Sequence, residues 1–189
     1  DPLHLVDNLV GALRHEVVRS IREYFYTTDF YEIATPTLIR STPEGARDFL
    51  VPSRIYPGKF FALPQSPQLY KQILMVSGFD KYFQIARCYR DEDPRGDRQL
   101  EFPQLDIELG FVKRDDILAL MEDLFGYVFK DVMNTELPKH FKRLTYHEAM
   151  NTYGCDKPDL RYGLEIHDAA PFAKESSFTL FQETLQNGG

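Results

Sequence analysis

The chain has 189 residues, of which 43% are hydrophobic and 27% are charged, with a formal net charge of −7. These values are ordinary for a globular protein with one sizeable core, and the negative charge argues against a general surface for polyanions. No apolar run approaches the roughly 20 residues that cross a bilayer, so we expect no membrane span. The start does not resemble a signal peptide and the two cysteines form no ligand pattern, which favours a reduced, cytoplasmic setting without zinc.

The N-terminal segment predicts a helix followed by an extended stretch. Asp1-Pro2 is a plausible helix start, and we expect the helix to end near Thr27. The residues from Phe30 to Ile39 favour a strand, but Pro36 lacks a ladder donor, so this strand should lie at an edge or an interface. The apolar residues at helical spacing are Val6, Leu9, Leu13, Val17, Ile21 and Phe25.

A loop over residues 41–48 leads into two predicted short strands, 49–51 and 60–63, and then into a helix. Ser66-Pro67 starts this helix and Gly78 ends it. Its polar face carries Gln68, Lys71 and Gln72, and its apolar face offers Leu69, Ile73 and Val76 for packing.

The first turn of that helix has free backbone N–H groups and the positive end of the helix dipole. Lys71 adds a full positive charge one turn further on, so a small carboxylate could bind there. The alternative is that Lys71 and Gln68 are simply the solvated face of a surface helix.

Residues 82–111 predict a strand, a charged loop and a second strand. Gln84, Ala86, Cys88 and Arg90 share one side of the first strand. In the second, Pro103, Leu105, Ile107, Leu109 and Phe111 alternate with Gln104, Asp106 and Glu108. Because a polar strand face is a poor buried surface unless it lines a wet cleft, these faces indicate a ligand site.

The charged residues of this segment allow more than one role. Arg90 beside Asp91-Glu92 is either part of a surface ion-pair cluster or a strand-end arginine that neutralises a phosphate while an acid reads a base or an amine. Asp106 and Glu108 suit a hard cation such as Mg²⁺, an amine, or a buried ion-pair network.

The C-terminal part predicts two more helices. Asp115 or Asp116 caps the first, and a capping box at Thr145 opens the second, which Gly154 ends. Residues 168–189 have no sustained periodicity.

Three segments, in order, resemble class II aminoacyl-tRNA synthetases in their bacterial aspartyl form. Residues 90–102 resemble motif 2, and residues 42–52 and 63–72 are similar to segments of the amino-acid pocket. The helix to Thr27 and the Pro36 strand resemble motif 1, the family's dimer element. The motif 2 residues are Arg90, Asp91, Glu92, Asp93, Arg95, Asp97, Arg98, Gln99, Glu101 and Phe102.

This resemblance implies an α+β fold in which an antiparallel sheet is flanked by helices. Residues 1–160 would be a partial catalytic domain with motifs 1 and 2, and residues 161–189 the start of the bacterial insertion domain or a disordered tail. Motif 3 and the anticodon-binding barrel are not found, so we expect a catalytic fragment with little or no adenylation activity by itself.

The implied activity is ATP-dependent formation of aspartyl-adenylate and transfer of the aspartyl group to tRNA(Asp), with Mg²⁺ ligands mostly outside this segment and no metal ligand within it. The implied catalytic residue is Arg90. The implied aspartate-binding residues are Glu44, Ser66, Gln68, Lys71, Arg90, Gln104 and Asp106. The implied ATP-binding residues are Arg90, Asp91, Glu92, Gln99 and Phe102.

The roles that follow are specific. Arg90 would contact the α-phosphate and the reacting carboxylate, Glu92 the adenine amine, and Phe102 the adenine ring. Lys71 would hold the substrate's side-chain carboxylate, and Asp106, with Gln104, its ammonium group. A homodimer would form through residues 3–39. The alternatives are a non-discriminating enzyme that also charges tRNA(Asn), and a non-catalytic paralogue that binds an amino acid or only dimerises.

Overall fold

The computed structural model describes residues 2–42, 44–93, 95–96 and 98–187, with the backbone alone for residues 2–7. Its contacts divide the chain into two compact units, Asp1–His140 and Phe141–Gly189. This boundary lies some way before residue 160, where the sequence placed the end of the catalytic part. The candidate site belongs to the first unit.

The first unit has an α+β fold, as expected. Its sheet has the order β1-β4-β5, and β2 and β3 form a separate hairpin. β4 and β5 pair antiparallel over nine residues, whereas β1 and β4 pair parallel. A parallel pair needs a long connection, and the hairpin and α2 supply it. The elements are α1 Pro2–Thr27, β1 Tyr31–Glu32, β2 Leu50–Pro52, β3 Phe60–Ala62, α2 Gln68–Val76, β4 Lys81–Tyr89, β5 Glu101–Leu109 and α3 Arg114–Met133.

One face of the sheet forms the core with α1 and α3, as the alternation in β5 predicted. Phe25 of α1 stacks on Phe83 of β4 with ring centroids 4.6 Å apart, and both side chains are fully buried. Each such burial is worth about 1.5–3 kcal/mol. Leu105, Ile107 and Leu109 of β5 pack against the same cluster. This packing fixes the register that directs the even-numbered residues of β5 to the other face.

Phe111 departs from the predicted alternation. β5 ends at Leu109, and Phe111 has φ 58° and is fully exposed. The turn into α3 therefore removes it from the core face.

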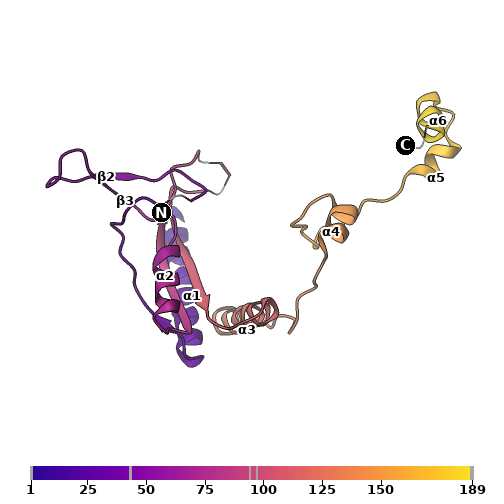
Figure 1. The fold of residues 1–189 in the computed structure, drawn as a ribbon. Coiled ribbons are helices and arrows are strands. Elements are labelled where there is room, and N and C mark those ends of the chain that lie inside the picture. The colour runs from indigo at the N-terminus through magenta and orange to yellow at the C-terminus, as the bar shows by residue number, and fades with distance from the viewer. Residues whose placement is uncertain (1, 43, 94, 97, 188–189) are drawn as a thin grey trace. The chain divides into compact units, whose positions relative to one another are not determined.

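The other face of the sheet is covered by α2, in front of the sheet in Figure 1, while α1 lies behind it. The packing prediction for α2 was wrong. Lys71 is buried, whereas Leu69, Ile73 and Val76 are exposed. The helix contacts β4 and β5 through its Lys71 side, because carboxylates on β5 compensate the buried ammonium group.

The strand predicted over residues 30–39 is shorter than expected. Only Tyr31 and Glu32 join the ladder, at the edge of the sheet. Pro36 lies outside it, and Ile39 makes an isolated bridge to Ala62. The edge position agrees with the restriction that Pro36 imposes.

The N-terminus of α3 also differs in detail from the prediction. Lys113 is the N-cap residue, and Asp116 at the third helical position accepts a hydrogen bond from the Lys113 backbone N–H at 2.8 Å. Asp116 thus satisfies an N-terminal donor without being the cap itself.

The second unit contains α4 Tyr146–Tyr153, α5 Ala170–Glu175 and α6 Thr179–Gln186. The predicted capping box of α4 is present at Thr145 and Glu148, and Gly154 ends the helix at φ 68°. α5 and α6 form a hairpin in the region without sequence periodicity. The Gln182 amide donates to the carbonyls of Ala173 and Ser176 and so joins the two helices.

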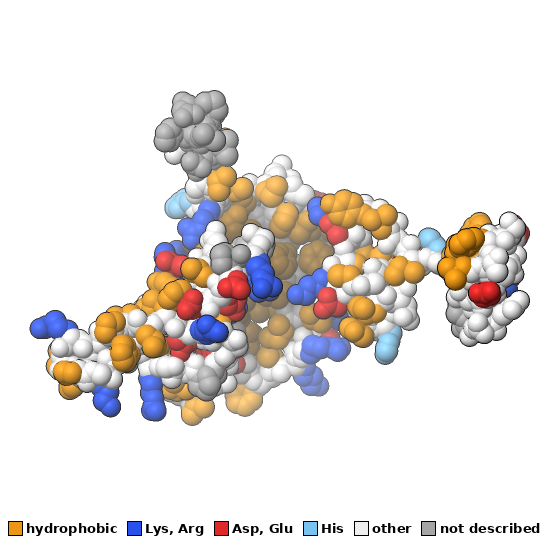
Figure 2. Space-filling model, turned by 90° about the horizontal axis from the view of Figure 1, so that it is seen from above, with side chains coloured by type: hydrophobic (Ala, Val, Ile, Leu, Met, Phe, Trp, Pro, Cys, Tyr) orange, Lys and Arg blue, Asp and Glu red, His pale blue; other side chains and the backbone are white. Residues whose placement is uncertain are grey.

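The described surface mixes both signs of charge. Figure 2 shows Lys and Arg interspersed with Asp and Glu over the viewed face, between apolar side chains. Within the described ranges, no helix has the length and apolar character needed to cross a membrane.

Candidate active site

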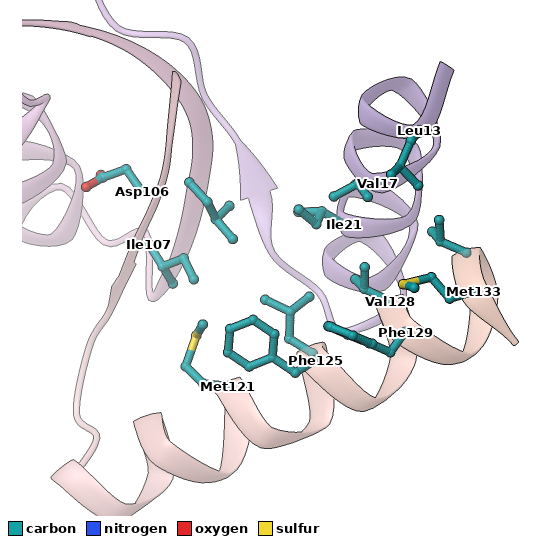
Figure 3. Close-up of a pocket in the computed structure, with 13 residues that line it drawn as sticks. Leu13, Val17, Ile21, Asp106, Ile107, Met121, Phe125, Val128, Phe129 and Met133 are labelled. Carbon is teal, nitrogen blue, oxygen red and sulfur yellow. The ribbon is translucent and has the colours of Figure 1, made fainter. Parts of the chain in front are cut away.

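The register of β4 and β5 brings the two polar strand faces together. Gln84 lies opposite Asp106, Ala86 opposite Gln104, and Cys88 opposite Phe102. Directly opposed residues project to the same side of the sheet with Cβ atoms about 4.5–5.5 Å apart. Figure 3 shows the carboxylate of Asp106 on the side of β5 away from Ile107, which points towards α3. The polar face predicted from the sequence is therefore one continuous surface beneath α2.

Lys71 and Asp106 form a buried ion pair at the centre of this surface. Lys71 Nζ lies 2.8 Å from Asp106 Oδ1 and 3.3 Å from Glu108 Oε2. The side chains of Lys71 and Asp106 are only 11% and 8% exposed. This arrangement contradicts the interpretation of Lys71 as part of a solvated helix face, and it realises the ion-pair alternative for Asp106 and Glu108.

The charges of this cluster are not balanced. Burial lowers the pKa of Lys71, but the hydrogen bond and charge of Asp106, aided by Glu108, outweigh it and leave that pKa raised. Lys71 is thus a cation at neutral pH, between two carboxylates. Asp106 Oδ2 is buried and has no hydrogen-bond partner among the described residues. A buried carboxylate oxygen of this kind is suited to receive a donor from a ligand.

The loop over residues 44–48 is held beside this cluster by Gln65. Its side chain accepts from the Ala46 backbone N–H at 3.0 Å and donates to the Ala46 carbonyl at 2.8 Å and to Asp48. Ser66 Oγ donates to Glu44 Oε2 at 3.2 Å. Glu44 and Ser66, which were assigned to the same pocket, are therefore in contact.

A second subsite lies at the end of the strand pair, where the charged loop begins. A cavity of about 400 Å³ is lined by Arg90, Glu92, Arg98, Gln99 and Phe102. The Arg90 guanidinium lies over the Phe102 ring, 5.1 Å from its centroid, and Arg98 lies 3.8 Å from Glu92. An arginine, an aromatic ring and a carboxylate around one cavity suit a flat heterocycle with an attached anion.

Cys88 and Gln104 connect the two subsites. The Cys88 thiol lies 3.4 Å from Gln104 Oε1. Burial raises the pKa of Cys88 to about 11, while the nearby charges of Arg90 and Asp106 act on it in opposite directions. The pKa of this buried thiol therefore depends on one charged residue from each subsite.

Two of the predicted site residues lie at the margins. Gln68 is exposed. Asp91 is exposed too, and its backbone N–H donates to the Arg47 carbonyl at 3.0 Å. Three residues near the subsites escaped the sequence prediction, namely Gln65, Tyr82 and Arg98. Tyr82 shares the polar strand face, Arg98 lies within motif 2, and Gln65 lies within the pocket-like segment 63–72. Alternation and the motif patterns therefore offered a signal for each.

A larger cavity, of about 660 Å³, lies on the opposite face of the sheet (Figure 3). Its walls are apolar side chains of α1, α3 and β5, among them Leu13, Ile107 and Phe125. Asp106 is the one polar residue among the described residues that line it, and its carboxylate turns to the other side of β5. The candidate active site therefore remains on the α2 face.

The chain belongs to the family of class II tRNA synthetases for aspartate, lysine and asparagine. The model of this family, tRNA synthetases class II (D, K and N), matches residues 8–181. Among curated relatives, an aspartate–tRNA(Asp/Asn) ligase of Treponema denticola is 59% identical over 177 residues, 94% of this chain. One of Trichodesmium erythraeum is 58% identical over 178 residues. The chain spans about 30% of the length of these relatives.

Solved structures of the family resemble the fold. Asparaginyl-tRNA synthetase of Entamoeba histolytica, in complex with asparaginyl-adenylate, superposes with a TM-score of 0.65 and 30% identity over 76% of this chain and 34% of that protein. The asparaginyl-tRNA synthetase of Pyrococcus horikoshii, also with asparaginyl-adenylate, gives a TM-score of 0.59 and 25% identity, covering 66% of this chain and 28% of that one.

Proposed function

We propose that this chain is the motif 1 and motif 2 part of an aspartate–tRNA ligase. The observation that carries the proposal is the buried Lys71 cation between Asp106 and Glu108, in a chain 59% identical to an aspartate–tRNA(Asp/Asn) ligase. Residues 1–160 belong to the catalytic domain, and residues 161–189 begin the insertion domain.

The amino-acid subsite selects aspartate through charge. Lys71 exchanges part of its pairing with Asp106 and Glu108 for the side-chain carboxylate of the substrate, and Asp106 Oδ2 accepts from the substrate's ammonium group. Gln68 and Gln104 line the pocket, and Glu44, held by Ser66, covers it. A buried cation favours a carboxylate over the neutral amide of asparagine, since the amide leaves the cation unpaired.

The nucleotide subsite takes ATP. Its cavity fits the group, because Phe102 and Arg90 offer a stacking surface and a cation within 5.1 Å of each other, and Glu92 and Gln99 line the same wall. Phe102 stacks on the adenine, Glu92 accepts from its amine, and Gln99 and Asp91 border the site. Arg90 reaches the α-phosphate.

The chemistry needs positioning more than proton transfer. The substrate carboxylate attacks the α-phosphate in line, pyrophosphate leaves, and no general base is required. Arg90 neutralises charge that develops on the phosphate in the transition state, so it is the catalytic residue of this chain.

The Mg²⁺ that accompanies ATP in such reactions is assigned mostly to residues outside this chain. Within the described ranges, no three His, Cys, Asp or Glu side chains are grouped so that they could hold a metal ion. Mg²⁺ would supply charge neutralisation on the phosphates.

The names of the relatives extend the proposal to the tRNA. Because those at 56–59% identity are named aspartate–tRNA(Asp/Asn) ligases, we propose that the intact protein charges tRNA(Asp) and tRNA(Asn) with aspartate. It acts in the cytoplasm as a homodimer that uses residues 3–39. A non-catalytic paralogue is less well supported, since both subsites keep their charged residues.

Pyrophosphate exchange by the full-length protein tests the proposal. We expect exchange that depends on aspartate and not on asparagine or lysine, and aspartylation of both tRNAs. The 189-residue chain alone should show little or no exchange. Exchange with asparagine or lysine in place of aspartate, or no exchange at all, would refute the assignment.

A further inference from the structure

A chain of polar side chains, of which Tyr82 is buried and Thr35 and Gln84 are half-buried, leads from the segment before Pro36 towards Asp106. Thr35 Oγ1 donates to Gln84 Oε1 at 3.0 Å, and the Tyr82 hydroxyl donates to the same oxygen at 2.8 Å. Gln84 lies directly opposite Asp106 in the β4–β5 ladder. Neither Tyr82 nor Gln84 has a role in the mechanism above.

Tyr82 is a neutral donor close to the Asp106 carboxylate. Its side chain is fully buried. Burial raises the pKa of the Tyr82 phenol most, followed by the negative charge of Asp106 and a hydrogen-bonding contribution from its side chain. The one proton of Tyr82 therefore stays in place at neutral pH. Two acceptors lie near that proton, the amide oxygen of Gln84 and the Asp106 carboxylate, and the hydrogen bond that the hydroxyl makes is the one to Gln84.

This choice of acceptor has a consequence for the pocket. A buried carboxylate attracts any donor within reach, because hydrogen bonds to charged groups are stronger than those to neutral ones. Asp106 Oδ2 nevertheless lacks a partner among the described residues. Thr35 donates to the same Gln84 oxygen as the Tyr82 hydroxyl and so helps to hold that oxygen towards Tyr82.

We propose that Gln84 is a positioning residue, which Thr35 orients so that it holds the Tyr82 proton away from Asp106 and keeps Oδ2 open for the substrate's ammonium group. This inference rests on the proposed function of the site. Without Gln84, the Tyr82 hydroxyl turns to Asp106 and competes with the substrate. Through the hydrogen bonds of Thr35 and Tyr82 to Gln84, the affinity for aspartate depends on the segment next to Pro36.

The test uses Gln84→Met in the full-length protein, because methionine has a similar length and shape but no amide. In pyrophosphate exchange we expect the KM for aspartate to rise about tenfold, as for the loss of a charged hydrogen bond. The KM for ATP should stay within about twofold, since Gln84 does not line the nucleotide cavity. Adding Tyr82→Phe removes the competing hydroxyl and should return the aspartate KM to within about threefold of the unsubstituted value.

This reversal separates positioning from general damage, because a merely structural role would make the second substitution worsen the first. Tyr24→Phe is the matched control: Tyr24 is also buried and donates to the Leu120 carbonyl, but it lies in the core on the other face. Alone it should leave the KM for aspartate unchanged, and combined with Gln84→Met it should neither raise nor lower the KM of that variant.

Thr35→Val, alone and with Tyr82→Phe, repeats the test at a half-buried position if Gln84→Met does not fold. An unchanged KM for aspartate, or a further loss on adding Tyr82→Phe, would overturn the inference. Absence of aspartate-dependent exchange in the unsubstituted protein would overturn the proposed function and this inference together. If the unsubstituted protein exchanges normally and the KM for aspartate of the variants does not change as expected, only the role of Gln84 is refuted.

Discussion

Lys71 Nζ and Asp106 Oδ1 lie 2.8 Å apart beneath α2, with both side chains about nine-tenths withdrawn from solvent. Glu108 approaches the same nitrogen at 3.3 Å. The ammonium group is the partner that makes two neighbouring carboxylates tolerable inside the protein. The Lys71–Asp106 ion pair thus affects both the stability of the strand pair and the charge of the candidate pocket.

Replacing Lys71 by leucine should remove aspartate activation and also destabilise the fold. It leaves Asp106 and Glu108 without their shared cation, and breaking a buried ion pair costs about 3–5 kcal/mol. We expect a lower unfolding midpoint in urea and no measurable aspartate-dependent exchange by the full-length protein.

The control for this variant is Lys130→Leu, which removes an exposed lysine whose pair with Glu136 is worth about 0–1 kcal/mol. It should change neither measurement. Adding Asp106→Asn to Lys71→Leu should restore part of the stability but none of the activity. Aspartate activation that survives Lys71→Leu would refute the role of this lysine.

Phe102→Leu should weaken ATP binding and leave aspartate binding nearly unchanged. The ring lies against the Arg90 guanidinium at 5.1 Å, and leucine keeps apolar volume but loses the flat stacking surface. Because stacking of a base on an aromatic side chain is worth about 1–3 kcal/mol, the KM for ATP should rise about tenfold.

Phe111→Leu supplies the comparison for Phe102, since Phe111 follows the same strand but is fully exposed. Its kinetic constants should match those of the unsubstituted protein. Equal effects of the two substitutions on the KM for ATP would argue against stacking at Phe102.

Gln65→Leu should loosen the loop over residues 44–48 without unfolding the sheet. The substitution removes both hydrogen bonds to the Ala46 backbone, each worth about 0.5–1.5 kcal/mol. Hydrogen exchange followed by mass spectrometry should show faster exchange in this loop and unchanged protection of β4 and β5. Gln72→Leu, on the exposed side of α2, should change neither the exchange of the loop nor the protection of the strands. If the loop stays protected in Gln65→Leu, the hydrogen bonds of Gln65 do not hold it in place.

The strand pair could be predicted in detail because one physical rule governs it. Period-two alternation in residues 104–109 separates the core face from the polar face, and the packing of Phe83 on Phe25 enforces that separation. Pro103, which the pattern assigned to the core face, is exposed. The same rule placed Asp106 on the polar face before any contact was known. Local helix signals, such as the capping box at Thr145, were equally sufficient because their partners lie three residues apart.

The orientation of α2 could not be predicted, because it depends on residues distant in sequence. By periodicity alone, Leu69, Ile73 and Val76 form the face to bury. Burial of Lys71 instead becomes favourable only when Asp106 and Glu108, 35 and 37 residues further on, meet it across the sheet. The anchoring of Ala46 by Gln65 depends likewise on a loop contact that no periodic pattern encodes.

The two cysteines should differ sharply in reactivity towards iodoacetamide. Cys155 is exposed, whereas Cys88 is fully buried and burial raises its pKa to about 11. Only the thiolate is alkylated, and at pH 8 a thiol with that pKa is about 0.1% ionised. Mass spectrometry of peptides from the folded full-length protein should therefore show Cys155 modified at pH 8 and Cys88 almost unmodified.

The pH dependence of this labelling tests the burial directly. Modification of Cys88 should accelerate only as the pH rises towards 11, because that is where its thiolate forms in the folded state. In urea the unfolded chain loses the desolvation that raises the pKa, so the rates at Cys88 and Cys155 should converge at pH 8. Rapid labelling of Cys88 at pH 8 in the folded protein would mean that the strand face between the two subsites is open to solvent, and it would contradict the contact of its thiol with Gln104.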